Sequence, residues 1–320
     1  MDVINQIVTD KYALYHGDCV EVVSGINDDS VDFSIFSPPF ASLYTYSNSD
    51  RDMGNCNNDD EFFSQFSYLV EQLYRVLRPG RLIAIHCMNL PTSKQNDGFI
   101  GIKDFRGDLI RLFQKYGFIY HSEVCIWKDP VVAMQRTKAL GLLHKTIKKD
   151  SAMSRQGIPD YLVVVRKPGE NTKPIEGEFT HFVGDELMNA FIERERHDGR
   201  VAQFPDKDRG ATSIDVWQRY ASPVWHDINQ TNTLNFKEGR DSDDERHICP
   251  LQLDVVERAM QLWSMEGDVV LTPFLGIGTE AYQAVSMGRK AIGVELKESY
   301  FNLAVRNVQQ AEKQQYDLFA

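Results

Sequence analysis

The chain has 320 residues, of which 42% are hydrophobic and 25% charged, a composition typical of a globular protein. Its net charge of −11 argues against a coat-like, non-specific nucleic-acid binder, although it leaves room for a local basic groove. The five scattered cysteines form no Cys-x-x-Cys pair, no apolar run reaches membrane-span length, and residues 1–6 lack a secretion signal. We therefore expect a cytoplasmic protein without a zinc site or membrane contact.

Strands and helices are expected to alternate along most of the chain. The expected strands are 12–18, 31–36, 81–86, 119–127, 160–165, the start of 268–279, and 290–295. The expected helices are 19–26, 61–77 (capped by Asp59 or Asp60 and ended by Pro79-Gly80), 105–116, 251–263, 279–287 and 299–314. This alternation predicts an α/β protein with a largely parallel sheet between helices. No helix is expected between strands 119–127 and 160–165, which leaves an antiparallel edge as one arrangement.

The stretch Ser37-Pro38-Pro39-Phe40 directly follows a strand with apolar residues. Consecutive prolines cannot donate backbone hydrogen bonds and force extended geometry, so the strand ends here in a rigid loop. In open α/β sheets, ligands bind at the carboxyl ends of the strands. A flat ligand with polar edges could stack on Phe40 and donate hydrogen bonds to Ser37 and the Pro38 carbonyl. The alternative is a structural turn with a buried phenylalanine.

A second motif, Gly276-Ile277-Gly278, lies between a buried strand and a helix, and Glu295 ends the next strand. Glycines allow a ligand to approach a helix N-terminus closely, and an acid at the second strand end can pair with ribose hydroxyls. This pattern predicts a nucleotide-type cofactor, either a nicotinamide or S-adenosylmethionine. A tight structural turn is the alternative.

Residues 131–149 contain only basic charges, and Arg155 follows shortly after. A solvated helix face is the usual explanation, but in so acidic a protein the run favours contact with phosphates. The predicted DNA-binding side chains are those of Arg136, Lys138, Lys145, Lys148, Lys149 and Arg155. A linker-like segment begins at Lys167, and residues 170–246 are charged and irregular.

The two motifs in this order resemble the permuted beta class of DNA amino-methyltransferases, which methylate N4 of cytosine or N6 of adenine. The resemblance implies a seven-stranded Rossmann-like methyltransferase sheet with one reversed strand, plus a small target-recognition region. It further implies that residues 1–168 form the catalytic half, 169–246 an insertion with target recognition, and 247–320 the half that binds S-adenosylmethionine. DNA and a cognate restriction nuclease are the implied partners, in a bacterial cell, with a phage or prophage origin left open.

The resemblance also implies roles for single residues. Ser37, Pro38, Pro39 and Phe40 would form the catalytic pocket, and Trp127 would line the pocket for the target base. The implied cofactor-binding residues are Asp18, Pro250, Phe274, Gly276, Gly278, Thr279 and Glu295. One departure is Thr272, because the family usually has an Asp there that helps to hold the cofactor's ammonium group.

An aromatic amine is a poor nucleophile, because its lone pair is delocalised into the ring. Two acceptors aimed at its N–H groups, from Ser37 and Pro38, would favour direct methyl transfer, which depends mainly on positioning. Ser in the first position is commoner in N4-cytosine enzymes, so we expect N4-cytosine, with N6-adenine as the alternative. Two other classes stay open: a nicotinamide dehydrogenase, which leaves Ser37 to Phe40 unexplained, and a DNA-binding protein that has lost its activity.

Overall fold

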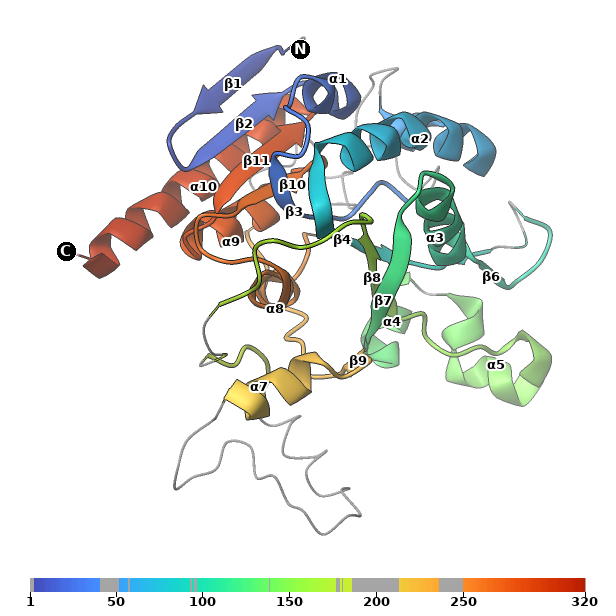
Figure 1. Ribbon diagram of the computed structural model, residues 1–320. Coiled ribbons are helices and arrows are strands. Elements are labelled where there is room, and N and C mark those ends of the chain that lie inside the picture. Colours follow the sequence, from blue (N-terminus) through green and yellow to red (C-terminus); the bar gives the residue numbers. More distant parts are fainter. Residues whose placement is uncertain are drawn as a thin grey trace, which may run out of the picture.

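The β-strands of the computed structural model form one large sheet (Figure 1). The structure describes residues 3–40, 52–56, 58–92, 94, 97–137, 139–176, 179, 181–185, 213–235 and 250–319. Within these residues, nine strands form a sheet in the order β1-β2-β11-β10-β3-β4-β8-β7-β9. They are β1 (Asn5–Val8), β2 (Tyr12–His16), β3 (Val31–Phe36), β4 (Leu77–Met88), β7 (Ile119–Ile126), β8 (Asp160–Arg166), β9 (Val224–Trp225), β10 (Val269–Thr272) and β11 (Lys290–Glu295). A separate pair joins β5 (Leu90–Pro91) to β6 (Ile102–Lys103).

Helices cover both faces of this sheet, as the alternation in the sequence predicted (Figure 1). They are α1 (Cys19–Ser24), α2 (Asp59–Val76), α3 (Phe105–Lys115), α4 (Pro130–Thr137), α5 (His144–Lys149), α7 (Ser213–Tyr220), α8 (Leu253–Trp263), α9 (Thr279–Ser286) and α10 (Glu298–Phe319). Short 3-10 turns occur at Met53–Asn55, Leu140–Leu142 and Ser151–Met153. None of the helices in the described residues is both long enough and apolar enough to cross a membrane.

The strand count differs from the seven strands expected from the sequence. The two additional strands are β1 and β9, at the two edges of the sheet, with four and two residues respectively. Strands β2, β11, β10, β3 and β4 are parallel neighbours, whereas β8 runs antiparallel to β4 and β7, and β1 antiparallel to β2. The β7–β8 pair is therefore antiparallel, but it is not at an edge, and α4 and α5 lie between its two strands in the sequence.

Two apolar clusters hold the helices against the sheet. Helices α1, α2 and α3 pack on one face, where Phe62 and Phe66 of α2 are fully buried. Helices α8, α9 and α10 pack on the other face. Asn58, rather than Asp59 or Asp60, caps α2 by accepting a hydrogen bond from the Glu61 amide. This helix ends at Val76, and Leu77 already belongs to β4, so Pro79-Gly80 lies within the strand.

Both predicted halves of the methyltransferase domain contribute to the one sheet. Strands β2, β3, β4, β7 and β8 come from residues 1–168, and β10 and β11 come from residues 247–320. The intervening segment adds β9, whose Trp225 is fully buried. The division into three regions stays a prediction.

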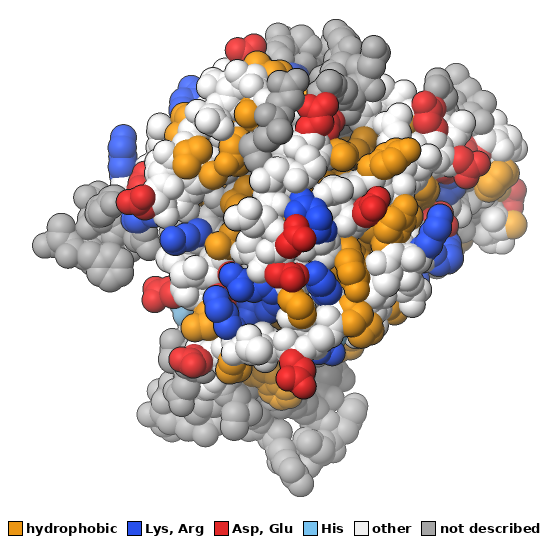
Figure 2. All heavy atoms as spheres, turned by 45° about the horizontal axis from the view of Figure 1, so that its top comes forward, with side chains coloured by type: hydrophobic (Ala, Val, Ile, Leu, Met, Phe, Trp, Pro, Cys, Tyr) orange, Lys and Arg blue, Asp and Glu red, His pale blue; other side chains and the backbone are white. Residues whose placement is uncertain are grey.

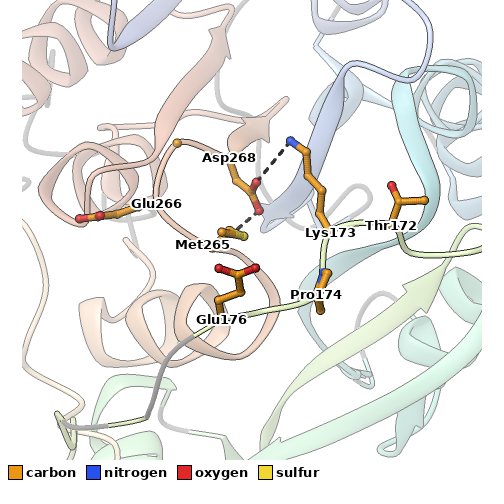
Figure 3. Close-up of a pocket in the computed structure, with 8 residues that line it drawn as sticks. Thr172, Lys173, Pro174, Glu176, Met265, Glu266 and Asp268 are labelled. Carbon is orange, nitrogen blue, oxygen red and sulfur yellow. Dashed lines mark hydrogen bonds and ion pairs between the residues drawn. The ribbon is translucent and has the colours of Figure 1, made fainter.

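A cluster of buried charges joins β3 to β10 at their amino ends. Arg81 donates hydrogen bonds to the Asp268 carboxylate and, over 2.6 Å, to the backbone carbonyl of Asp32. The Asp268 carboxylate also accepts a hydrogen bond from the Met265 amide, and Lys173 Nζ lies 4.0 Å from it (Figure 3). Lys173, Met265 and Asp268 also line a pocket, together with Thr172, Pro174, Glu176, Glu266 and Gly267. This pocket lies at the opposite ends of the strands from the predicted site.

Removing the Asp268 charge should destabilise the protein, because it leaves the buried Arg81 guanidinium without its carboxylate. We expect Asp268→Asn to lower the free energy of unfolding by about 3–5 kcal/mol. The matched control is Asp28→Asn, which breaks an ion pair with Arg75 whose acidic side chain is 73% exposed. That change should cost less than about 1 kcal/mol. Urea unfolding of both variants provides the measurement, and equal losses would contradict a buried, energetically important pair.

Candidate functional site

The loop Ser37 to Phe40 begins where β3 ends, beside the carboxyl end of β10. β10 lies between β3 and β11, and these strands are parallel, so Ser37, Gly276 and Glu295 all follow or end strands at one edge of the sheet. Pro38 is buried and Phe40 is half-buried, with its ring edge-on to Phe105 at 6.2 Å between centroids. The structure therefore places the two sequence motifs at the same edge, as the sequence predicted.

Ser37 contacts a histidine that was not among the predicted site residues. The Ser37 hydroxyl lies 3.2 Å from Nδ1 of His86, near the carboxyl end of β4. On the other side of the ring, Nε2 of His86 lies 3.1 Å from Asp160 Oδ2. Lys128 Nζ approaches the same carboxylate oxygen at 2.5 Å. Four polar side chains from four segments thus form a continuous chain that ends at Ser37.

Asp160 is ionised in this arrangement. The side chain is 3% exposed, and burial alone would raise its pKa. His86 and Lys128 outweigh that effect and hold the pKa of Asp160 below its ordinary value. A buried carboxylate held in this way can fix the orientation of the imidazole ring that lies between it and Ser37.

The glycine turn after β10 is tied to the end of β11. Glu295 accepts hydrogen bonds from the Gly276 amide at 2.7 Å and from the Lys297 amide at 2.8 Å. Gly276 and Gly278 have φ angles of +53° and +92°, which favour glycine. A Cβ atom at Gly276 would meet nothing within 4 Å, so this part of the turn faces open space. The turn can therefore receive a ligand beside a strand-end carboxylate.

Two carboxyl groups of this region have raised pKa values. Burial raises the pKa of Glu295 to about 7, although hydrogen bonds from backbone amides work in the opposite direction. Burial also raises the pKa of Glu280, in the first turn of α9, to about 8. The hydroxyl of Thr272, at the end of β10, is buried and has no hydrogen-bond partner among the described residues. A polar ligand group would satisfy this hydroxyl.

Some predicted cofactor residues have clear structural contacts of their own. Asp18 caps α1 through a hydrogen bond from the Glu21 amide. Phe274 packs against Phe36 and Phe66, and Thr279 is buried as the first residue of α9. Pro250 is half-buried just before α8, whereas residues 247–249 lie outside the described residues. The cofactor roles of these residues stay predictions.

The basic stretch forms α4 and α5, between the carboxyl end of β7 and the start of β8 (Figure 1). In α5, Lys145, Lys148 and Lys149 are exposed. Arg136 belongs to α4, and Lys138 lies outside the described residues. Arg155 is half-buried, and its side chain packs over Gly141 and donates to the Gln156 carbonyl. Of the predicted DNA contacts, the three lysines of α5 are thus available to a partner.

Trp127 lies directly after β7 and is 41% exposed, next to Lys128. Its backbone amide donates to the Trp225 carbonyl at 3.0 Å, so β9 helps to position it.

On the face shown in Figure 2, basic side chains are interspersed with acidic ones, and the negative net charge is not gathered into one acidic surface there. A local basic region is therefore compatible with the overall charge.

The sequence contained one signal for the residues that were missed. His86 lies near the end of the apolar run of β4, and Asp160 opens that of β8. Polar residues at strand ends beside a predicted ligand-binding edge are as informative as a motif. Their contact, however, depends on the pairing of β4 with β8, which the sequence does not reveal.

The fold is that of an α/β methyltransferase. A family model described as DNA methylase, of the N6/N4 methyltransferase type, matches residues 31–306. Since this match covers most of the chain, the protein belongs to this DNA methylase family. As a methyltransferase of this family it uses S-adenosylmethionine as the methyl donor, which confirms the cofactor expected from the sequence.

Curated relatives extend over most of the chain. The Type II methyltransferase M.BglII of Bacillus subtilis is 24% identical over 91% of this chain and 67% of its own length. M.MjaI of Methanocaldococcus jannaschii, also a Type II methyltransferase, is 23% identical over 91% of this chain and 89% of its own length. Relatives therefore occur in both bacteria and archaea.

Solved structures share the fold. The PvuII DNA methyltransferase (cytosine-N4-specific) superposes with a TM-score of 0.60 at 14% identity, covering 99% of this chain and 97% of that one. TTHA0409 from Thermus thermophilus, solved in complex with S-adenosyl-L-methionine, gives a TM-score of 0.61 at 21% identity and covers 94% of this chain and 96% of that one. The large mixed sheet is thus a methyltransferase fold.

Proposed function

We propose that the protein methylates the exocyclic N4 amine of cytosine in a specific DNA sequence, with the target base turned out of the duplex. The observation that carries this proposal is the position of Ser37-Pro38-Pro39-Phe40 at the carboxyl end of β3, at the same sheet edge as the glycine turn and Glu295. Ser37 as the first residue of the motif favours cytosine. Methylation of adenine N6 is the alternative.

Ser37 and Pro38 would act on the amine of the target base. The Ser37 oxygen and the Pro38 carbonyl accept hydrogen bonds from the amine and draw its nitrogen toward tetrahedral geometry. S-adenosylmethionine supplies an electrophilic methyl group. The protein's contribution is mainly to align the amine for in-line attack.

Base capture has an energetic cost that aromatic side chains can offset. Turning a base out of the stack costs a few kcal/mol, and stacking on an aromatic ring returns roughly 1–3 kcal/mol. Phe40, half-buried at the end of the loop, and Trp127, exposed after β7, are the candidates for this contact.

The residues present fit the methyl donor. The Glu295 carboxylate would accept hydrogen bonds from the ribose hydroxyls, and the open space beside Gly276 leaves room for the ligand. The unpartnered Thr272 hydroxyl and the buried Glu280 carboxyl are polar groups of β10 and α9 close in sequence to the turn. They are candidates for the ammonium contact that the family's aspartate makes.

DNA would lie against α5 and the loop Ser37 to Phe40, and residues 169–246 would read the target sequence. The exposed lysines of α5 support this orientation, because α5 follows the carboxyl end of β7 in the chain. A cognate restriction nuclease is the further partner we propose, since the curated relatives include Type II methyltransferases.

Cofactor binding should depend on pH through Glu295. The ionised carboxylate accepts the ribose hydrogen bonds, and below its pKa of about 7 the free protein holds a proton there instead. Affinity should therefore fall as the pH is lowered, by about tenfold between pH 8 and pH 6. Calorimetric titration of S-adenosylmethionine at both values tests this. Glu295→Gln is the control and should bind weakly and equally at both pH values; a wild-type affinity independent of pH would contradict the role.

The product and two variants test the reaction. Mass spectrometry of nucleosides from methylated DNA should show N4-methylcytosine. Ser37→Ala keeps the Pro38 carbonyl, so it should slow methylation without abolishing it, whereas Phe40→Ala should weaken both base capture and rate. Both should bind S-adenosylmethionine almost as the wild type does, since Glu295 is unchanged. N6-methyladenine would overturn the choice of base. 5-methylcytosine would overturn the mechanism, because methylation at C5 needs a covalent cysteine adduct and the loop Ser37 to Phe40 contains no cysteine.

The lysines of α5 should contribute to DNA affinity and to its salt dependence. Replacing Lys145, Lys148 and Lys149 by Gln should weaken binding and reduce the slope of log K against log salt by about one unit for each phosphate that is no longer neutralised. The matched control replaces three other exposed lysines, Lys115, Lys290 and Lys313, by Gln. Fluorescence anisotropy between about 50 and 200 mM salt gives both slopes. If both triple variants give the same slope of log K against log salt, DNA does not contact the lysines of α5.

A further inference from the structure

Ser37 hydrogen-bonds to a side chain that can also accept a proton. His86 Nδ1 lies 3.2 Å from the Ser37 hydroxyl, and His86 is 8% exposed. The opposite ring nitrogen lies 3.1 Å from the carboxylate of Asp160, which is 2% exposed. Lys128 completes the chain at 2.5 Å from the same carboxylate. An acceptor, an orienting acid and a hydroxyl at a predicted reaction centre are the elements of general base catalysis.

The sheet itself brings these groups together. In the β4–β8 pairing, His86 is opposite Leu162 and Met88 is opposite Asp160. His86 and Asp160 are therefore diagonal neighbours whose side chains project from the same face of the sheet. This contact exists only because β8 runs antiparallel to β4, so that its first residue lies beside the last residue of β4. The reversed strand thus supplies the acid.

The charges on this face of the sheet favour one tautomer of the His86 ring. Lys128 and Asp160 form an ion pair, and the same carboxylate oxygen lies 3.1 Å from His86 Nε2. Nε2 makes no hydrogen bond to the described residues in this geometry, but the negative charge beside it favours a proton on this nitrogen. With the proton on Nε2, Nδ1 carries a lone pair toward the Ser37 hydroxyl. Cys87 and Tyr161 alternate with His86 and Asp160 along their strands and so belong to the opposite face. Other titratable side chains near this part of β4 and β8 are those of Asp104, Arg106, Glu123 and Cys125.

We propose that His86, oriented by Asp160, is a positioning residue that acts through Ser37 as the proton acceptor of the methylation. This inference rests on the proposed function and extends it to two residues outside the Ser37 to Phe40 loop. It explains why a serine, rather than an ionised acid, can stand at the first position of that loop: the hydroxyl gains basicity when its own proton is drawn toward His86.

The proton balance is complete within the chain. Methylation forms a bond from carbon to the amine nitrogen and breaks the bond from carbon to sulfur, which leaves the sulfur as a neutral thioether. The amine nitrogen then carries one proton too many. That proton passes to the Ser37 oxygen as the hydroxyl proton passes to His86 Nδ1. Asp160 stabilises the resulting imidazolium, which later releases its proton to water.

The kinetic test uses His86→Asn in the whole 320-residue chain. Asparagine can keep a hydrogen-bonding group near the position of Nδ1, but it cannot take the proton. We expect the single-turnover rate with saturating DNA and S-adenosylmethionine to fall about 100-fold, while both affinities change less than about twofold. The control is His121→Asn, because His121 is exposed on β7 and also lies beside a serine, Ser122, at 2.9 Å. This control should keep the wild-type rate.

A double variant distinguishes action through Ser37 from an independent structural effect. Groups that act as one unit lose their function together, so His86→Asn should slow methylation no further in a Ser37→Ala background. Multiplied losses would overturn the proposal, as would a His86→Asn enzyme of wild-type rate. If wild-type protein methylates neither cytosine nor adenine, the proposed function fails, and the ring state must then be tested directly.

That direct test is nitrogen-15 NMR of labelled histidines, with the His86 signals assigned from His86→Asn. We expect the neutral ring to carry its proton on Nε2, with a Nδ1 resonance that shifts in Ser37→Ala because the hydrogen bond from the hydroxyl is absent there. A neutral ring protonated on Nδ1 would donate to Ser37 instead of accepting from it. That result would overturn the proposal whether or not the enzyme is active.

Discussion

β3 and β10 pair in parallel although they lie far apart along the chain. Val270 is opposite Phe33 and Leu271 opposite Ser34, and the buried Ser34 hydroxyl donates to the Leu271 carbonyl across 237 residues of sequence. The alignment of the two sequence motifs follows from this pairing. It aligns the end of β3, which carries Ser37, with the end of β10, which leads into the glycine turn, and β11 then brings Glu295 to the same edge.

Charge is used differently at the two ends of this strand pair. At the amino ends, Arg81 pairs with Asp268, the Asp32 carboxylate pairs with Arg78 and Lys173, and these contacts fix the strands. At the carboxyl ends, Glu295 and Glu280 have raised pKa values, and the Thr272 hydroxyl lacks a partner among the described residues. Folding alone provides partners for the charges at the amino ends, whereas a bound ligand would provide partners for the polar groups at the carboxyl ends. Such unequal satisfaction of buried polar groups is expected where structure is retained for function.

Much of this could be predicted from the sequence, because the signals were local. Two prolines end a strand, two glycines open a helix, and the strand boundaries around Val31–Phe36 and Lys290–Glu295 agree with the structure. Edge strands β1 and β9 were missed because four and two residues carry no periodic pattern. The contact from Ser37 through His86 to Asp160 was missed for a different reason. It depends on strand direction and register, which no local pattern specifies.

The pairing of β3 with β10 also has a consequence for how the protein is made. The ribosome delivers residues in order, and domains assemble as their segments emerge. The ribosome releases the loop Ser37 to Phe40 and helix α2 early. Strand β10, which lies next to β3 in the sheet, and strand β11 beyond it emerge only after residue 268. Until then the edge of β3 has no partner on one side, and loop closure over so long a separation is intrinsically slow. A nascent chain therefore carries its target-base loop for most of its synthesis without the strands that complete it, and activity begins only once those strands have emerged and paired.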